Sequence, residues 1–204
     1  MGDLALNKSS LKSERDRLKT FERFLPSLDL KRQQLMVEFK KAQKTHQATQ
    51  EEVKALLVSL EGLLELLGAS TMDLSNYVKL QKITVEEENV VGVRLPALKD
   101  LEFQLEEYST LAKPFWVDAL IDHLQKASEL RIRAGIEQTR VDLLDDAVRK
   151  ITQRVNLFEK VLIPDAKENI HRIRIFLGDA ERAAVVRSKL VKSKNRRTPS
   201  ERKS

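Results

Sequence analysis

The chain has few side chains suited to acid–base or metal chemistry, and they are scattered. Three histidines, the side chains that titrate nearest neutral pH, stand at His46, His123 and His171. The sequence has no cysteine, and the histidine spacing matches no zinc motif. His46 interrupts a mostly apolar seven-residue repeat, where the simpler interpretation is a polar residue that specifies helix register. We therefore predict no metal site.

Patterns typical of catalysis or nucleotide binding are also missing from the sequence. Asp145 and Asp146 are adjacent, and neighbours on a helix point in different directions, so they are interpreted as solvated side chains. The six glycines are dispersed, and no loop of the form Gly-x-x-x-x-Gly-Lys-Ser/Thr occurs. No nucleophile stands with a base and an orienting group in a recognisable arrangement. We expect a chain that is not an enzyme by itself and holds no cofactor.

Positive charge is concentrated near the C-terminal end. The formal net charge is +6, and from Arg187 onward eight lysines and arginines stand against the single Glu201. Two interpretations are open: a solvated, disordered tail over residues 193–204, or a basic surface that contacts nucleic acid or an acidic protein. The sequence has no base-reading helix motif and no aromatic stacking platform, so nucleic-acid binding has no second line of support.

Long helices must position these residues. Charged residues make up 33% of the chain and aromatic residues only 5%, which favours helices with narrow apolar seams over a broad core. Over residues 116–192, apolar side chains recur every seven positions, the period of a left-handed coiled-coil seam. The row, polar only at Asn169, contains Leu120, Ala127, Ala134, Val141, Val148, Val155, Leu162, Phe176, Ala183 and Leu190.

The companion row of this C-terminal helix is interrupted. After Leu144, Ile151 and Phe158 it meets polar residues before it resumes at Val186. Together with Asn169 and Pro164, the polar residues of the interruption are Asp165, Arg172 and Asp179. One interpretation is a drift of register in which Ile173 and Ala180 take over the seam. The other is that the helix here faces a partner outside the chain.

The N-terminal segment, residues 4–67, repeats with the same period. One row runs through Leu11, Leu18 and Leu25 to Leu60, and its companion includes Leu35. Pro26 lies inside the pattern and predicts a kink or short break, because proline removes a helix hydrogen bond and clashes with the preceding turn. Two long helices with matching seams at opposite ends of one chain most simply pair antiparallel.

The middle of the chain changes character. The first helix is expected to end near Gly68. Alternating and β-branched residues at 77–85 and 90–95 predict two strands of a β-hairpin, with its turn at residues 86–89. Pro96 is expected to end the second strand and begin a short helix over residues 97–111, and Pro114 marks the next boundary.

The predicted fold is therefore mainly α: a long antiparallel two-helix coiled coil with a small middle segment that carries a β-hairpin and a short helix. The expected ranges are 1–68, 69–114, 115–192 and a basic, disordered tail at 193–204. No stretch approaches 18 uncharged apolar residues and no signal peptide is recognisable, so the sequence predicts no membrane insertion.

Four segments carry a resemblance to a known family. Residues 154–164, Arg-Val-Asn-Leu-Phe-Glu-Lys-Val-Leu-Ile-Pro, closely resemble the "RRVNALEyvlIP" block of the D subunits of V-type (A/V-type) ATPases and ATP synthases. Residues 30–35, 89–96 and 173–192 resemble the family's segments in the same order. The family's paired arginines before Val-Asn are Gln153-Arg154 here, and the stretch around Pro26 looks like a bacterial branch.

This resemblance implies the central rotor stalk of a rotary ATPase. The implied role is a non-catalytic shaft that transmits torque between the hexamer of A and B subunits and the membrane ring, during ATP synthesis or hydrolysis coupled to ion (hydrogen ion) transport. The F subunit would bind alongside, and the C subunit would link the shaft to the ring. The implied location is cytoplasmic, peripheral to the membrane in the soluble sector, with no nucleic acid bound and no direct membrane insertion.

Candidate interface residues follow from the resemblance and from the polar breaks. They are Arg154, Asn156, Asp165, Asn169, Arg172, Asp179, Arg182, Arg187, Lys189, Lys192, Val91 and Val93. Two alternatives remain open: a free-standing structural coiled-coil protein, and a nucleic-acid-binding protein that uses the basic tail.

Overall fold

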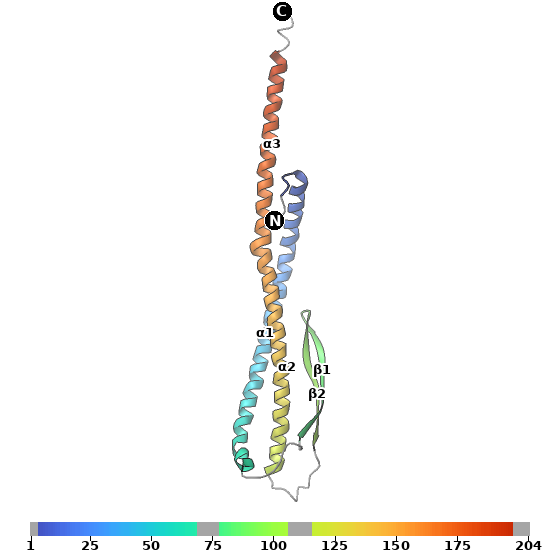
Figure 1. Ribbon diagram of the computed structural model, residues 1–204, viewed down its shortest axis with the longest axis vertical. Helices are drawn as coiled ribbons and strands as arrows, with labels where there is room; N and C mark the ends of the chain where they lie inside the picture. The colour runs from blue at the N-terminus through green and yellow to red at the C-terminus, as the bar shows by residue number, and fades with distance from the viewer. Residues whose placement is uncertain (1–3, 69–77, 106–115, 198–204) are drawn as a thin grey trace, which may run out of the picture. The chain divides into compact units, whose positions relative to one another are not determined.

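The computed structural model describes residues 4–68, 78–105 and 116–197 (Figure 1). In chain order the elements are helix α1 (Lys8–Gly68), strands β1 (Val78–Val90) and β2 (Val93–Leu105), helix α2 (Trp116–Leu157), a five-residue π-helix η1 (Phe158–Leu162) and helix α3 (Ile163–Arg197). The chain forms two compact units. Unit 1 combines Met1–Leu30 with Thr152–Ser204, and unit 2 is Lys31–Ile151.

Helix α1 is 61 residues long, and both of its ends have local causes. Asn7 caps it, because its Oδ1 accepts a hydrogen bond from the Ser10 backbone N–H at 2.7 Å. The helix ends at Gly68, as predicted. The break expected at Pro26 is absent, since α1 continues through it. Pro26 and Glu22, whose carbonyl would have bonded the missing N–H, both have exposed side chains, so this carbonyl can be hydrated at little cost.

In unit 2, α1 pairs antiparallel with α2. Residues 38–45 of α1 share a cavity with residues 133–144 of α2, and residues 52–59 share a groove with residues 122–126. The buried side chains are those of the predicted rows, with Leu35 on α1 and Leu120, Leu144 and Val148 on α2. The seven-residue period therefore predicted the seam of this unit.

Unit 1 is also an antiparallel helix pair. Residues 15–22 of α1 line a groove with residues 167–174 of α3, and Lys8 reaches Glu181 at 4.0 Å. Phe21 and Phe158 meet edge to face with ring centroids 5.4 Å apart. The predicted coiled coil is thus confirmed within each unit.

The π-helix explains the interrupted seam of the C-terminal segment. The Ile163 N–H bonds to the carbonyl of Phe158, five residues back, so this turn contains one residue more than an α-helical turn. Accordingly, the buried positions step by eight from Val155 to Ile163 and by seven again to Ile170. Ile173 is fully buried, which confirms the drift of register, whereas Ala180 is exposed and does not join the seam.

The hairpin differs from its prediction in two ways. Its turn is at Val91–Gly92, both with positive φ (53° and 82°), and residues 86–89 belong to β1. Asn89 Oδ1 supports the turn by accepting the Gly92 N–H at 2.9 Å. Two consecutive positive φ angles match the twist of the flanking strands, which the charged run at residues 86–88 could not provide.

The second difference concerns Pro96. Strand β2 continues through it to Leu105, and Pro96 pairs with Glu87, so residues 97–105 form strand where a short helix was expected. A two-stranded sheet has only edge strands, and a proline is tolerated where its missing N–H would face outward. The rest of the expected short helix, and Pro114, lie outside the described residues.

The C-terminal helix is longer than predicted. Residues 193–197, expected in the disordered tail, belong to α3, which runs to Arg197. Residues 198–204 lie outside the described part of the chain. No described helix is long and apolar enough to cross a bilayer.

Candidate subunit-interface surface

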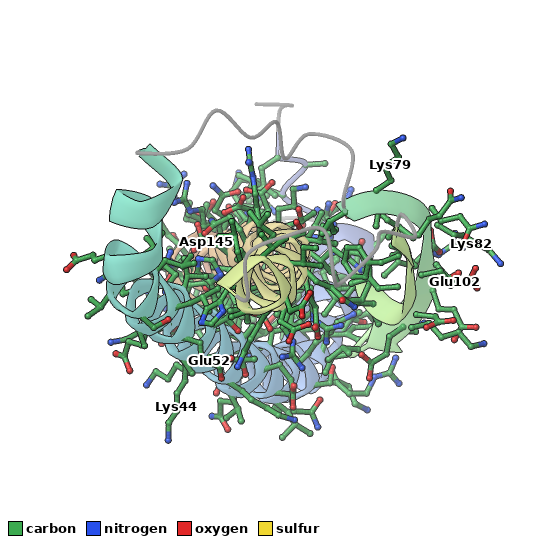
Figure 2. All side chains as sticks on the ribbon, turned by 90° about the horizontal axis from the view of Figure 1, so that it is seen from below. Lys44, Glu52, Lys79, Lys82, Glu102 and Asp145 are labelled. Carbon is green, nitrogen blue, oxygen red and sulfur yellow. The ribbon has the colours of Figure 1, made fainter. Side chains whose placement is uncertain are left out.

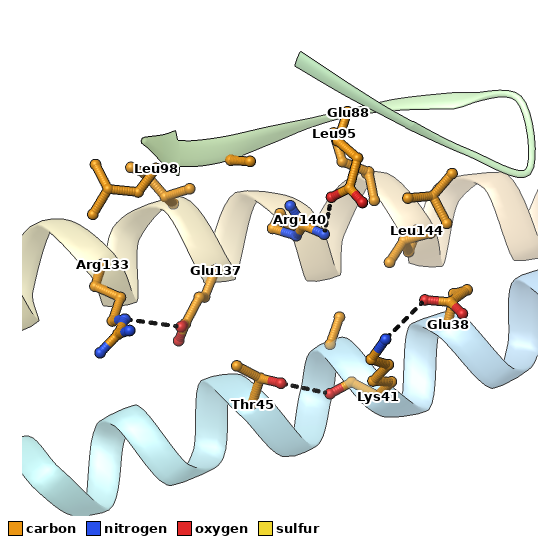
Figure 3. A pocket seen from close by; sticks show the side chains of 14 residues that line it. Glu38, Lys41, Thr45, Glu88, Leu95, Leu98, Arg133, Glu137, Arg140 and Leu144 are labelled. Atoms are coloured by element: carbon orange, nitrogen blue, oxygen red, sulfur yellow. Dashed lines mark hydrogen bonds and ion pairs between the residues drawn. The ribbon is translucent and has the colours of Figure 1, made fainter. Parts of the chain in front are cut away.

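The hairpin is held against the helix pair of unit 2 by one arginine. Arg140 on α2 donates from Nη2 to Glu88 Oε2 (Figure 3) and from Nη1 to the Pro96 carbonyl, both at 3.0 Å. Leu95 beside it is 1% exposed. A cavity of about 300 Å³ remains between α1, α2 and the hairpin. One guanidinium therefore contacts both strands, which fixes the hairpin on α2.

A second polar contact lies in the seam next to this cavity. His46 Nδ1 on α1 lies 4.0 Å from Glu137 Oε2 on α2, and both atoms are buried without a hydrogen-bond partner. Glu137 is also 3.8 Å from Arg133, and His46 Nε2 lies 2.8 Å from the Gln50 amide. This geometry fits the register-specifying role predicted for His46. Among the described residues, no cluster of His, Asp and Glu could hold a metal ion.

The outer surface of unit 2 carries charges of both signs. Seen from below, Lys44 and Glu52 point outward from α1, and Lys79, Lys82 and Glu102 point outward from the hairpin (Figure 2). Lys82 and Glu102 pair across the strands at 3.8 Å. Such exposed pairs contribute little stability and mark a solvated surface.

The hairpin candidates Val91 and Val93 lie at its tip. Val91 is in the turn and Val93 begins β2 opposite Val90. Both are half-buried. The large apolar side chains that the described hairpin exposes lie on β1, at Leu80, Ile83 and Val85.

The candidates near the π-helix and on the first part of α3 divide into paired and unpaired groups. Arg172 pairs with Glu168, and Asp179 lies 3.4 Å from Arg182. Arg154 and Asp165 are exposed, whereas Asn156 and Asn169 are half-buried. These residues belong to α2 and α3 in unit 1 and do not converge on a pocket. Only the exposed ones lie on helix faces turned away from the seam.

The last part of α3 has the most open surface of the described chain. Lys8, the first residue of α1, stands beside Glu181, and α3 continues beyond it (Figure 1). Every side chain from residue 179 to residue 194 is exposed, including Arg182, Arg187, Lys189 and Lys192. Apolar side chains lie among them with more than half of their area exposed: Val185, Val186, Leu190 and Val191. A basic and apolar helix surface that no other described element covers is typical of a surface that binds another protein.

Comparison with known proteins agrees with this architecture. The family model that describes the D subunit of ATP synthase matches residues 10–193. The chain belongs to the ATP synthase D-subunit family. That match spans α1, the hairpin and nearly all of α3, so the family pattern covers both compact units.

Bacterial relatives support the membership over nearly their full length. A protein of Borreliella burgdorferi, named as the D subunit of a V-type ATP synthase, is 35% identical over 193 residues, which cover 95% of each chain. Proteins of the same name from Chlamydia abortus and Chlamydia muridarum are 32% and 31% identical, with at least 92% of each chain covered. The resemblance inferred from residues 154–164 is thereby confirmed.

Sequence reasoning missed the arginine that holds the hairpin. Arg140 stands among many charged helix residues, and its partners are 44 and 52 positions away in the chain. A signal was present in the strands. Glu88 on β1 pairs with Leu95 on β2, so a neighbouring element should offer a cation to Glu88 and an apolar surface to Leu95. This signal can be recognised only once the turn is placed at Val91–Gly92.

Proposed function

We propose that this chain is the central rotor shaft of a V-type ATPase, a non-catalytic subunit that transmits torque between the catalytic hexamer and the membrane rotor ring. Its partners would be the A and B subunits around the shaft, the F subunit beside it and the C subunit below, at the cytoplasmic side of the membrane. Membership in the D-subunit family and the antiparallel helix pairs support this proposal.

The observation that carries the proposal furthest is the exposed end of α3. In water, residues 182–194 of this helix would gain almost nothing from tertiary packing, and helices draw most of their stability from such packing. The A and B subunits, if they surround the shaft, would bury Val185, Val186, Leu190 and Val191 and contact the basic residues between them. An asymmetric shaft surface would then favour different states of the catalytic interfaces through differential contacts.

Truncation tests this assignment. A chain that ends after Glu181 should lose at least a hundredfold in affinity for a hexamer assembled from purified A and B subunits, measured by calorimetry. A chain that ends after Arg197 is the matched control and should bind as the full chain does. Because the described side chains among those removed, residues 182–194, are exposed, the thermal midpoint of the shorter chain should change little. Equal binding by both truncated chains would rule out the end of α3 as the hexamer contact.

Charge at the same surface can be tested separately. Replacing Arg182, Arg187, Lys189 and Lys192 together with alanine should weaken hexamer binding about tenfold and reduce its salt dependence, because exposed charges act mainly through screened, long-range attraction. Unchanged assembly and ATPase activity of the complex would assign the contact to the apolar residues alone.

The rival assignment is a free-standing structural coiled coil. Purification of the tagged chain from its native host distinguishes the two. The rotor-shaft proposal expects the A, B and F subunits to be recovered together with it, and recovery of the chain alone would support the rival.

A further inference from the structure

The cavity of unit 2 is bounded by three elements and is partly apolar. Its volume of about 300 Å³ is roughly twice that of an engineered apolar cavity that binds benzene, so it can hold an organic molecule of about ten non-hydrogen atoms. The largest apolar side chains that line it come from the hairpin and α2, namely Leu95, Leu98, Ile136 and Leu144, and α1 adds Ala42. Leu95 and Leu144 are each 1% exposed, so this apolar wall is part of the core.

Six charged side chains also line the cavity, and they form three pairs. The pairs are Arg140 with Glu88 at 3.0 Å, Arg133 with Glu137 at 3.8 Å and Lys41 with Glu38 at 4.0 Å (Figure 3). Cations and carboxylates are equal in number, so the cavity as a whole does not select a ligand by net charge. Selection must come from a group that its own pair leaves unsatisfied.

Glu137 is that group. Its side chain is 12% exposed, which makes it the most buried of the six. Arg133 approaches only Oε1, and at 3.8 Å this contact is longer than a hydrogen bond. None of the described residues donates a hydrogen bond to the buried Oε2, since His46 Nδ1 is 4.0 Å away. A buried carboxylate oxygen without a donor is costly, so a ligand that supplies one is favoured at this position.

We propose that the cavity is a binding site for a small amphipathic amine, whose protonated amino group binds Glu137 and whose apolar body packs on the apolar wall. Ammonium is the matching chemistry because it has three donors and the opposite charge, and charge-assisted hydrogen bonds are stronger than neutral ones. Figure 3 shows Glu137 pointing from α2 toward α1, whereas Leu95 and Leu98 approach α2 from the hairpin. A ligand that spans the cavity would therefore contact all three elements.

Such a ligand would strengthen the docking of the hairpin on the helix pair. Any molecule that binds only the docked state makes opening rarer by mass action. At a ligand concentration about ten times the dissociation constant, hairpin opening should become about tenfold rarer, which amide exchange in β2 measures. This inference goes beyond the rotor-shaft proposal and does not depend on it.

Three compounds of one shape test the class of ligand. The amine 3-phenylpropylamine should bind the full chain with a dissociation constant on the order of 1 mM, as expected for about ten non-hydrogen atoms at ordinary ligand efficiency. The neutral 3-phenylpropanol should bind about tenfold more weakly, and the 3-phenylpropanoate anion more weakly still, because its carboxylate would face that of Glu137. Methyl NMR titration at about pH 7 follows Ile136 and Leu144, whose signals report on the cavity itself.

Variants of the full chain test the position of the site. Glu137→Gln should weaken amine binding about tenfold and leave alcohol binding within about twofold, so that the two compounds bind alike. The matched control, Glu129→Gln, removes the same charge from an exposed position of α2 and should change neither affinity. Ala42→Leu should weaken both compounds, because the larger side chain fills part of the cavity. Circular dichroism confirms that each variant folds.

Three results would overturn the proposal. Equal amine binding by the Glu137→Gln and Glu129→Gln variants would remove the carboxylate from the site. Amine binding without shifts at Ile136 and Leu144 would place the compound outside the cavity. Tighter binding of the anion than of the amine would assign the cavity to carboxylates. The rotor-shaft proposal is tested by hexamer binding without these compounds, so it stands or fails separately.

Discussion

The two compact units share one architecture and use charge in opposite ways. Unit 2 contains seventeen lysines and arginines against twenty aspartates and glutamates, and unit 1 contains twenty against eleven. In unit 2 many charges meet a partner on another element, as in Arg140 with Glu88, Lys99 with Glu86 and Lys82 with Glu102. In unit 1 the pairs between elements are Lys8 with Glu181 and Lys167 with Glu22, and Arg17, Arg172 and Arg182 pair within their own helices. Charge in unit 2 is therefore nearly balanced, whereas unit 1 carries a clear excess of positive charge.

The units also differ in how their seams are built. The helices of unit 2 keep an uninterrupted seven-residue period and carry the hairpin on the outside. Unit 1 contains the π-helix. The buried positions of the helical segments before and after it follow seven-residue repeats that are offset by one residue. A π-turn costs helix regularity and is common at functional sites, and here it coincides with the most family-specific block of the sequence. Variants of the seam of unit 1 and of the Arg140 contact in unit 2 test this contrast.

The largest effect is expected from moving the seam of unit 1 by one residue. Deleting the exposed Lys167 turns every later α3 side chain by about 100°, so Ile170 and Ile173 would leave the seam, and unit 1 should lose its cooperative unfolding transition. Deleting the exposed Val161 is the matched control. It removes the extra residue of the π-turn and joins both phases in one regular helix, so we expect a change in unfolding free energy of about 1 kcal/mol or less.

Thermal and urea unfolding, followed by circular dichroism, measure both deletions. Equal destabilisation by the two would contradict the assignment of the phase shift to the π-helix. Loss of hexamer binding in the Val161 deletion with stability retained would show that the complex needs the turn itself.

A smaller loss is expected from a cavity in the seam of unit 1. Ile173 is fully buried, so Ile173→Ala should cost about 2–5 kcal/mol of unfolding free energy, since it removes buried methyl groups and leaves a void. Ile175→Ala, two residues on at a side chain that is 52% exposed, should cost less than about 0.5 kcal/mol. Similar losses at the two positions would mean that the seam does not shift at the π-helix.

In unit 2 the comparable weak point is the arginine that holds the hairpin. Arg140→Ala leaves the Pro96 carbonyl and Glu88 without their donor and should cost about 1–3 kcal/mol of hairpin docking. The effect should appear as faster amide exchange in β2, with little change for α1. Arg94→Ala, which removes only an exposed pair with Glu87, serves as the control and should leave exchange unchanged. Protection retained in Arg140→Ala would assign the docking to Leu95 alone.

Local sequence patterns were sufficient to predict the long helices and the presence of a hairpin. Leu35 and Leu144 could be assigned to a seam because burial in a two-helix pair repeats with the helix period, whereas Ile173 was one of two open interpretations. The position of the turn could not be assigned in the same way. Val91 is a β-branched residue in a backbone region that such residues rarely adopt, so propensity argued against the turn that the structure has.

Sequence alone was enough to establish which faces of the helices are apolar, where the first helix ends and which family the chain resembles, because periodicity, a terminal glycine and a contiguous block are all local signals. The π-helix could not be recognised in this way, because Leu162 continues the seven-residue row from Val155 and only burial shows that Ile163 takes its place. Tertiary structure was needed to show that Pro96 lies inside a strand, that Arg140 binds both strands and that Arg15 and Arg174 line one groove. These contacts join residues far apart in the chain, and their energies depend on distances that no local pattern encodes.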